Sequence, residues 1–358
     1  MTNRTLFIAE AGVNHNGSLD LALQLVDAAA DAGADIVKFQ TFKAQHLVTV
    51  QARKARYQAT NTGDDSGQIE MLCKLELGPA EHRLILERCI QRGIRFMSTA
   101  FDSESLDFLA TLDMPAVKIP SGDITHAPML MQAARVGLPL IVSSGMCTLS
   151  DIEAALGVIA FALTRDGSPD GCDELEDARN SPEGQAALLQ RVTLMHCVTE
   201  YPAPVGSVNL RAMDTMMQAF GLPVGYSDHT VGTAVSLAAV ARGATVIEKH
   251  FTLDRALPGP DHAASLEPGE LRALVADIRI VEEALGSSRK APAAVEIGNR
   301  EVARRSIVAA RSIAEGEVLT MDALAFKRPG TGLSPTDVWD LLGRPAGRDY
   351  QPDELIEW

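Results

Sequence analysis

Short apolar runs alternate with longer amphipathic stretches over most of the chain. Residues 18–33 illustrate the second kind, with Ser18 as a predicted N-cap, apolar residues at helical spacing and Gly33 after the end. Strand-to-helix alternation indicates a parallel sheet, and eight such units are the number that closes a (β/α)8 TIM barrel. The eight predicted strands lie at residues 6–9, 36–40, 95–99, 116–119, 140–145, 192–196, 224–226 and 246–247.

Two segments are longer than a simple connection requires. Residues 43–68 form a polar excursion and are a candidate lid. Residues 164–185 are polar and acidic and precede a strand, so we expect a solvated insertion on the non-catalytic face of the barrel. Between them, Ser150 to Glu153 has the pattern of a capping box that opens a helix.

The pattern changes after the last predicted helix. The barrel is expected to cover residues 1–285, and a linker is expected at 286–304. Residues 305–358 contain short β-prone runs and turn signals but no long helix. The sequence therefore predicts an α/β barrel followed by a small, β-rich domain.

Two consecutive predicted strands end in histidine-containing motifs. The strand at 224–226 runs into Ser227-Asp228-His229, and the next into Glu248-Lys249-His250. Because the carboxyl ends of parallel barrel strands lie on one face, His229 and His250 should meet there. Either imidazole alone could be a hydrogen-bonded strand-end residue, but the repeated pattern favours a site for a divalent transition metal.

Two other strands contain a lysine in an otherwise apolar run. Lys38 lies in IVKFQ and Lys118 in AVKIP. A lysine buried in such a strand is costly unless it meets an anion. With nearby serine and threonine hydroxyls, the two lysines suit a phosphate and a carboxylate on one small molecule. The alternative is that they pair with carboxylates such as Glu10 and Asp123.

Composition narrows the function classes. The 358 residues are 46% hydrophobic and 22% charged, which is typical of a globular protein with a sizeable core. A net charge of −15 argues against a nucleic-acid or anionic-membrane surface. The five cysteines are odd in number and lack CxxC spacing, so we expect reduced thiols. No signal peptide or membrane span is recognisable, and a cytoplasmic location is expected.

Several motifs together resemble one family. In chain order they are FIAEAGVNHNG, DIVKFQTF, KIPSGDIT, VSSGM, HCVTEYPAP, GYSDHT, IEKHFTLD and LPGPDH. This series resembles the sialic acid synthase family, whose members make nonulosonic acids. The later motifs ARRSI and FKRPGTGLSP resemble the antifreeze-like SAF domain, a β-clip fold, at the end of those enzymes. The resemblance implies a TIM barrel followed by a SAF domain.

The resemblance also implies a reaction and an assembly. Enzymes of this kind are transferases that condense phosphoenolpyruvate with an open-chain, N-acetylated mannose-type sugar and release phosphate. They depend on a divalent metal, with manganese the first expectation and magnesium or cobalt as alternatives. They form domain-exchanged homodimers, in which the small domain of one chain covers the active site of the other.

The family's functional residues fall on matching positions. The resemblance assigns the metal to His229 and His250 and puts an acidic residue near it at Glu10. For the base that assists the addition of water, we expect a carboxylate, Glu10 first and Asp261 second. Its phosphoenolpyruvate contacts fall on Lys38, Thr99, Lys118, Ser121, Ser143 and Ser227. Its sugar contacts fall on Gln40, Asp123, Tyr201, Asp261 and, from the other chain, Arg328. Two departures bear on the sugar: Asp123 replaces the glutamate of many relatives, and Thr199 replaces the asparagine of some.

The choice of sugar stays open at this point. N-acetylmannosamine, giving N-acetylneuraminate, is the first expectation. The alternative is 2,4-diacetamido-2,4,6-trideoxymannose, giving N,N'-diacetyllegionaminate, because residues 54–77 resemble both subgroups. Two remoter alternatives are an aldolase that uses Lys38 or Lys118 as a Schiff-base nucleophile, and a non-catalytic barrel that binds a sugar phosphate. Borohydride trapping would identify the first, and the absence of phosphate release the second.

Overall fold

The computed structural model describes residues 4–62 and 67–358. They form two compact units, Met1–Gly286 and Ser287–Trp358, and each unit is described by itself. Residues 63–66, within the candidate lid, lie outside the described residues.

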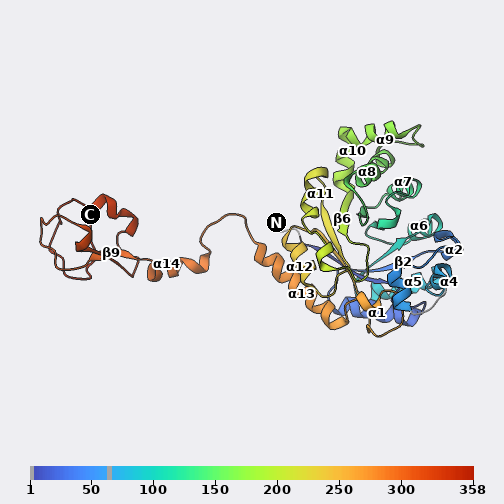
Figure 1. Ribbon diagram of the computed structural model, residues 1–358, viewed down its shortest axis with the longest axis horizontal. Helices are drawn as coiled ribbons and strands as arrows, with labels where there is room; N and C mark the ends of the chain where they lie inside the picture. The colour runs from blue at the N-terminus through green and yellow to red at the C-terminus, as the bar shows by residue number, and fades with distance from the viewer. Residues whose placement is uncertain (1–3, 63–66) are drawn as a thin grey trace. The chain divides into compact units, whose positions relative to one another are not determined.

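The first unit is a closed barrel of eight parallel strands (Figure 1). Each strand pairs with the next in the sequence, and β1 pairs with β8 to close the ring. This confirms the predicted TIM barrel. The strands are β1 (Leu6–Gly12), β2 (Ile36–Thr41), β3 (Arg95–Ala100), β4 (Val117–Ile119), β5 (Leu140–Ser143), β6 (Val192–Cys197), β7 (Val224–Asp228) and β8 (Val246–His250).

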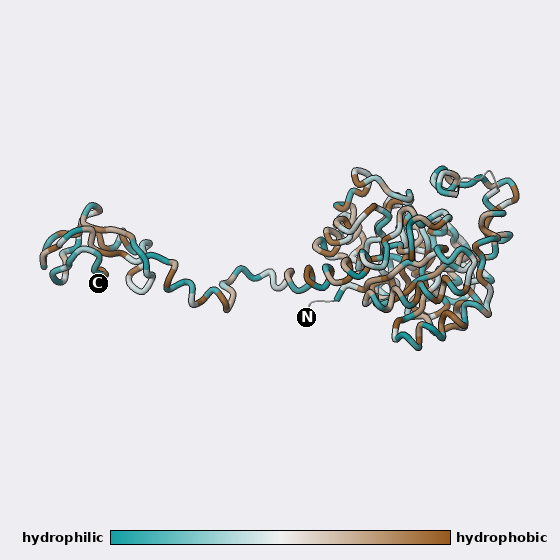
Figure 2. Tube along the Cα trace, turned by 90° about the horizontal axis from the view of Figure 1, so that it is seen from below, coloured by the Kyte–Doolittle hydropathy of each residue, from teal (hydrophilic) through white to brown (hydrophobic). Residues whose placement is uncertain are grey.

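Helices surround the strands and bury one side against them. Figure 2 shows hydrophobic and hydrophilic residues interleaved along the chain, as expected for helices with one buried side. The main barrel helices are α1 (Leu19–Asp31), α5 (Pro79–Arg92), α6 (Ser103–Leu109), α7 (Ala127–Arg135), α8 (Leu149–Thr164), α11 (Ala212–Phe220), α12 (Ala234–Ala241) and α13 (Pro268–Leu285).

Helix starts show where local signals predict well and where they mislead. Ser18 caps α1 by accepting a hydrogen bond from the Leu21 amide, as predicted. The capping box of α8 begins at Thr148, so the prediction of Ser150 was wrong by two residues. Asp151 closes the box in the structure, because its carboxylate accepts from the Thr148 amide at 2.8 Å.

The polar excursion after β2 contains three short helices, α2 (Ala44–Leu47), α3 (Arg56–Thr62) and α4 (Gln68–Cys73). It buries an apolar cluster of its own, separate from the main core. We call this set the outer apolar cluster. Its buried members are Val13, Phe42, Ala44, Met71, Leu72 and Leu75, and the partly buried Leu47, Val48, Ile69 and Phe101 pack against them.

The acidic insertion is folded rather than merely solvated. It forms α9 (Cys172–Asn180) and α10 (Pro182–Arg191), which pack against α8 (Figure 1). The pairing is close, because a Cβ atom on Gly157 would lie 3.2 Å from the Leu175 carbonyl oxygen. Helix α10 leads directly into β6, so it lies at the amino end of that strand.

The second unit has a small core around one antiparallel pair, β9 (Ser306–Ala309) and β10 (Leu324–Lys327). Buried side chains such as Ile307, Leu319 and Tyr350 fill the core. The described elements besides this pair are short: η4 (Ala294–Glu296), α14 (Ile297–Ala303), η5 (Met321–Ala323), η6 (Pro335–Asp337) and α15 (Val338–Leu341). Helix α14 lies in the segment that we expected to be a linker.

The structure bears on two further properties, membrane-spanning helices and the state of the cysteines. In the part of the chain that the structure describes, no helix combines the length and apolarity needed to cross a membrane. All five cysteines are free thiols, in agreement with the sequence-based expectation.

Candidate active site

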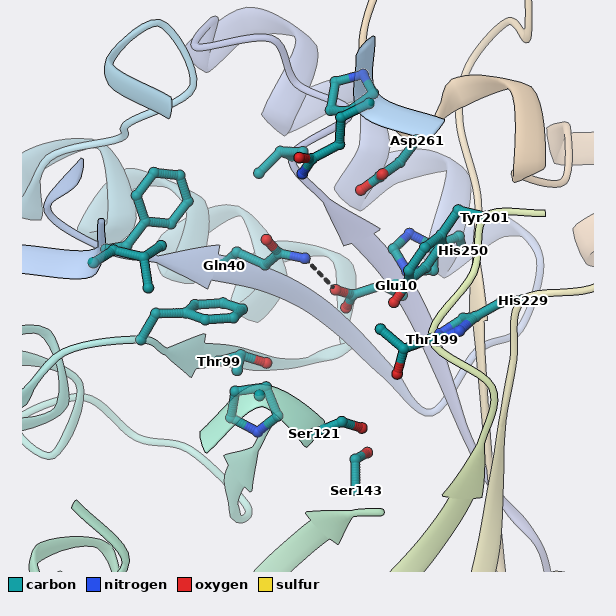
Figure 3. A pocket seen from close by; sticks show the side chains of 18 of the residues that line it. Glu10, Gln40, Thr99, Ser121, Ser143, Thr199, Tyr201, His229, His250 and Asp261 are labelled. Atoms are coloured by element: carbon teal, nitrogen blue, oxygen red, sulfur yellow. Dashed lines mark hydrogen bonds between the residues drawn. The ribbon is translucent and has the colours of Figure 1, made fainter. Parts of the chain in front are cut away.

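A cavity of about 420 Å³ opens where the barrel strands end at their carboxyl side. It brings together every site residue that the sequence predicted within the barrel (Figure 3). These residues are Glu10, Lys38, Gln40, Thr99, Lys118, Ser121, Asp123, Ser143, Thr199, Tyr201, Ser227, His229, His250 and Asp261. Arg328 belongs to the second unit, where it follows β10 and is exposed.

Two lysines and two glutamates form a buried chain of ion pairs in the cavity. Lys38 Nζ lies 2.7 Å from a Glu10 carboxylate oxygen and 3.5 Å from Glu248. Lys118 Nζ lies 3.3 Å from the other oxygen of Glu248. Strands β4 and β8 are not neighbours, so the Lys118–Glu248 pair crosses the barrel interior. The Lys38–Glu10 pair agrees with the alternative interpretation, whereas Lys118 pairs with Glu248 and not with Asp123.

Burial and neighbouring charges shift the pKa values of Glu10, Glu248 and Lys38 in different directions. Burial raises the pKa of Glu10 to about 7, although Lys38 opposes the shift. Burial would also raise the pKa of Glu248, but the charges of Lys118 and Lys38 outweigh it and hold that pKa well below its usual range. Burial acts to lower the pKa of Lys38, yet its two glutamate partners raise it overall. Glu248 and Lys38 are therefore charged at neutral pH, whereas Glu10 can take up or release a proton.

The two strand-end histidines meet as predicted, with ring centroids 5.6 Å apart. His229 Nδ1 is 2.6 Å from the Val198 carbonyl oxygen. The other ring nitrogen, Nε2, is 3.2 Å from the Ser227 hydroxyl oxygen. His250 Nδ1 is buried and has no hydrogen-bond partner among the described residues. Burial lowers the pKa of His229 to about 4, and burial also holds the pKa of His250 well below its usual value. Both imidazoles are therefore neutral, the form that binds a metal.

Hydroxyl groups line the part of the cavity near the lysines. Thr99 accepts a hydrogen bond from Lys38 Nζ at 2.9 Å, and Ser227 donates to Glu248 at 2.9 Å. Ser121 accepts from the Gly145 amide at 2.9 Å. The buried hydroxyls of Ser143 and Thr199 lack partners within the described chain. Their unused donors, beside two lysines, can bind the oxygens of a small anion.

Gly145 allows these hydroxyls to approach one another. A Cβ atom at this position would lie 2.2 Å from Thr199 Oγ1 and 2.8 Å from Ser121 Oγ. Any other residue would displace one of these side chains. The VSSGM motif therefore needs glycine at this position for steric reasons.

The remaining predicted residues, Gln40, Asp123, Tyr201 and Asp261, also line the cavity. Gln40 Nε2 donates to Glu10 at 3.2 Å (Figure 3), and the Tyr201 ring packs 4.1 Å from that of His229. Burial raises the pKa of Asp261 to about 6 and raises that of Asp123. Asp123 Oδ2 is a buried acceptor without a donor in the described structure. These groups can bind hydroxyl and amide groups of a second substrate.

Glu248, Tyr57 and Cys197 are among the cavity residues to which sequence reasoning gave no role. Glu248 holds both lysines, and its only signal was its place in the EKH motif beside His250. Tyr57 packs on Tyr201 with ring centroids 5.0 Å apart. Cys197 ends β6 and lies 3.1 Å from the Ser121 hydroxyl. No local pattern distinguishes Tyr57 or Cys197 from an ordinary packing residue.

Comparison with known proteins gives the same family along nearly all of the chain. Residues 25–290 match the NeuB family, and residues 304–358 match the SAF domain. An N,N'-diacetyllegionaminic acid synthase of Campylobacter jejuni is 46% identical over 99% of both chains. An enzyme of the same name from Legionella pneumophila is 44% identical over 98% of this chain and 93% of its own.

A solved structure extends the comparison. The N-acetylneuraminic acid synthetase of Leptospira borgpetersenii is 34% identical and has a TM-score of 0.67. The alignment covers 83% of this chain and 90% of that protein.

Proposed function

The chain belongs to the NeuB family of phosphoenolpyruvate-dependent nonulosonic acid synthases, and on that premise we propose that it makes N,N'-diacetyllegionaminate. The substrates would be phosphoenolpyruvate and open-chain 2,4-diacetamido-2,4,6-trideoxymannose, with release of phosphate. The observation that carries the choice of sugar is the 46% and 44% identity to two legionaminic acid synthases, against 34% to a neuraminic acid synthetase. N-acetylmannosamine, our first expectation, becomes the second candidate.

The lysine side of the cavity suits phosphoenolpyruvate. Lys38 and Lys118 supply positive charge, and the unpartnered Ser143 hydroxyl supplies a donor. Lys38 is held protonated by two carboxylates, which also argues against a Schiff-base mechanism, because that needs a neutral amine. Thr99, Ser121 and Ser227 complete the proposed anion site.

The histidine side suits a divalent metal, with manganese as our proposal. His229 and His250 are buried and neutral, and Nδ1 of His250 has no hydrogen-bond partner among the described residues. No group of three or more His, Cys, Asp or Glu side chains in the described ranges is arranged to hold a metal, so water and substrate would complete the coordination. Such a metal would act as a Lewis acid on the sugar aldehyde.

The proposed reaction forms one carbon–carbon bond and one carbon–oxygen bond, the latter to water, and breaks the carbon–oxygen bond to phosphate. The aldehyde oxygen takes up a proton and becomes a hydroxyl group. C3 of phosphoenolpyruvate attacks the aldehyde carbon, and the electron-deficient C2 that results adds water. Glu10 belongs to the buried ion pairs of the cavity and has a pKa of about 7, so it can take the proton from that water. Asp261 is the second candidate for this role. Phosphate then leaves from C2, and the lysines stabilise its charge.

The sugar would be bound by Gln40, Asp123, Thr199, Tyr201 and Asp261. We further propose a domain-exchanged homodimer, in which Arg328 contacts the acyl group of the sugar bound to the other chain. The support is the family resemblance of the FKRPGTG motif and the exposure of Arg328 on its own unit.

One kinetic comparison tests the proposed function. The purified protein, with manganese and saturating phosphoenolpyruvate, is offered each of the two sugars, and phosphate release and product mass are recorded. We expect a higher kcat/KM for the diacetamido sugar. A higher kcat/KM for N-acetylmannosamine would refute the proposed substrate, and no phosphate release with any N-acetylated sugar would refute the synthase itself.

A further inference from the structure

The lining of the catalytic cavity has two chemically different parts. The charged and hydroxyl-bearing residues described above gather at the strand ends, as the labelled side chains in Figure 3 show. The rest of the lining comes largely from the outer apolar cluster. Its contributors are Val13, Phe42, Leu47, Val48, Met71, Leu72, Leu75 and Phe101.

These apolar side chains are packed as a wall rather than scattered. The Phe42 and Phe101 rings meet edge to face with centroids 6.2 Å apart. Met71 and Leu72 from α4 belong to the same buried group as Phe42. Because the wall is held by its own packing, it presents a preformed apolar surface to whatever enters the cavity.

Such a surface discriminates between two kinds of sugar tail. A hydroxyl placed against it loses its hydrogen bonds to water and gains none, whereas a methyl group gains contact. The open-chain sugar must place its aldehyde near His229 and His250, so its far end has to extend over the remaining lining. A tail that ends in a methyl group fits that lining better than a tail that ends in a hydroxymethyl group.

We propose that the outer apolar cluster is the specificity-determining element for the far end of the sugar, selecting a 6-deoxy tail over one that ends in a hydroxymethyl group. The proposal rests on the proposed function, because it needs this cavity to take an N-acetylated sugar. It goes further by assigning the selection to apolar residues of the cluster that line the cavity, Phe42 and Met71 among them.

The test uses three sugars, so that the methyl group and the second acetamido group are judged separately. N-acetylmannosamine and 2-acetamido-2,6-dideoxymannose differ only in the hydroxyl on C6. The dideoxy sugar and 2,4-diacetamido-2,4,6-trideoxymannose differ only at C4. The first pair tests the apolar wall, and the second pair tests the substrate named in the proposed function.

In the wild-type enzyme we expect kcat/KM to be about tenfold or more higher for the 6-deoxy sugar than for N-acetylmannosamine. Met71→Gln and Phe42→Tyr each place a polar group in the wall and should reduce that ratio several-fold. Met71→Leu keeps the wall apolar and should retain it. Ile69→Gln is the matched control, since Ile69 packs on the cluster but is not among the residues that line the cavity.

Three results would overturn the inference. The first is a wild-type ratio near one, which needs no variant to fold. The second is a high ratio that neither Met71→Gln nor Phe42→Tyr changes. The third is an equal fall in Ile69→Gln, which would show that packing of the excursion, and not contact with the sugar, sets the ratio. If the wall behaves as expected but the C4 pair favours the monoacetamido sugar, only the proposed substrate fails.

Discussion

Asp228 and Lys249 form an ion pair with a 3.1 Å separation, and both side chains are completely buried. They are paired across β7 and β8, and each immediately precedes one of the two cavity histidines. Because side chains alternate along a strand, Asp228 and Lys249 point away from the barrel interior while His229 and His250 point toward the cavity. Asp228 also accepts from Ser236 of α12 at 2.6 Å, so the pair ties the two strand ends to the surrounding helices.

Breaking this pair should destabilise the barrel. In Lys249→Met the buried Asp228 carboxylate loses its counter-charge, and we expect a loss of about 3–5 kcal/mol in the free energy of unfolding. The double variant Asp228→Asn/Lys249→Met should recover part of that loss, because no uncompensated charge remains. Urea unfolding followed by circular dichroism measures both. A single variant within about 1 kcal/mol of wild type would contradict the prediction.

Removing either cavity histidine should abolish metal binding and turnover while the fold survives. His229→Ala and His250→Ala delete strand-end side chains that lie outside the main apolar core. Calorimetric titration with Mn²⁺ measures the loss of metal binding, and the far-ultraviolet circular dichroism spectrum shows whether the fold survives. His46→Ala is the control, since His46 is exposed and does not line the cavity. Unchanged Mn²⁺ affinity in either cavity variant would refute the assignment.

Loss of a cavity lysine should weaken phosphoenolpyruvate binding without removing the metal. In Lys118→Met one charge-assisted contact to the bound anion is lost, worth about 2 kcal/mol, or roughly a thirtyfold rise in its Kd. Calorimetry with phosphoenolpyruvate, and separately with Mn²⁺, distinguishes the two effects. Lys74→Met changes an exposed lysine and should leave both affinities unaltered. A wild-type affinity for phosphoenolpyruvate in Lys118→Met would place the anion elsewhere.

Acid should destabilise the barrel through its buried histidines, and His15 offers a test outside the cavity. Burial lowers its pKa to about 4, against about 6.5 in the unfolded chain. Between these values the unfolded state binds more protons, so stability is complete above pH 6.5 and falls as the pH drops toward 4. His15 should contribute about 2 kcal/mol to the difference in unfolding free energy between pH 7 and pH 5.

The variant His15→Asn isolates this contribution. Its side-chain oxygen can replace His15 Nδ1, which accepts from the Gly17 amide at 3.0 Å, but it does not titrate. Urea unfolding at both pH values should show a smaller drop in the variant than in wild type. An equal drop would mean that other groups account for the acid sensitivity.

Complementation tests the proposed domain exchange. An Arg328→Ala chain and a His229→Ala chain should each be nearly inactive alone. The first lacks the contact to the sugar, and the second does not bind the metal. In a mixed dimer one site would keep both residues, so up to about a quarter of the wild-type activity of the mixture should return by random pairing. If native mass spectrometry shows mixed dimers and no activity returns, Arg328 does not act on the other chain.

The strand-end residues could be predicted because their signal is local. A lysine or histidine at the end of an apolar run is unusual wherever the chain lies, and eight strands fix the ring on which those ends meet. The link from Lys118 to Glu248 could not be predicted in this way, because it joins residues 130 positions apart across the barrel interior. The sequence offered only nearby carboxylates such as Asp123 as alternatives to a substrate anion.

The outer apolar cluster was missed for a different reason. Its members come from α2 and α4, from the irregular segments beside these helices and from the bends after β1 and β3, with polar residues between them, so no window shows a regular period. The two helices of the acidic insertion were not predicted either, because its many charged residues give no sign of the contacts that α9 makes with α8. In both segments tertiary packing, rather than local pattern, decides the structure.

The excursion after β2 is closed on itself, because the Ala44 amide near its beginning donates to Glu76 near its end at 2.7 Å. A segment whose two ends are fastened together can be exchanged as a unit while the strands on either side keep their register. If the segment selects the sugar, exchanging the part of the gene that encodes it can change the product. The barrel would still catalyse the same type of reaction. Grafting the corresponding segment from a neuraminate-producing relative would then convert one pathway's enzyme into another's.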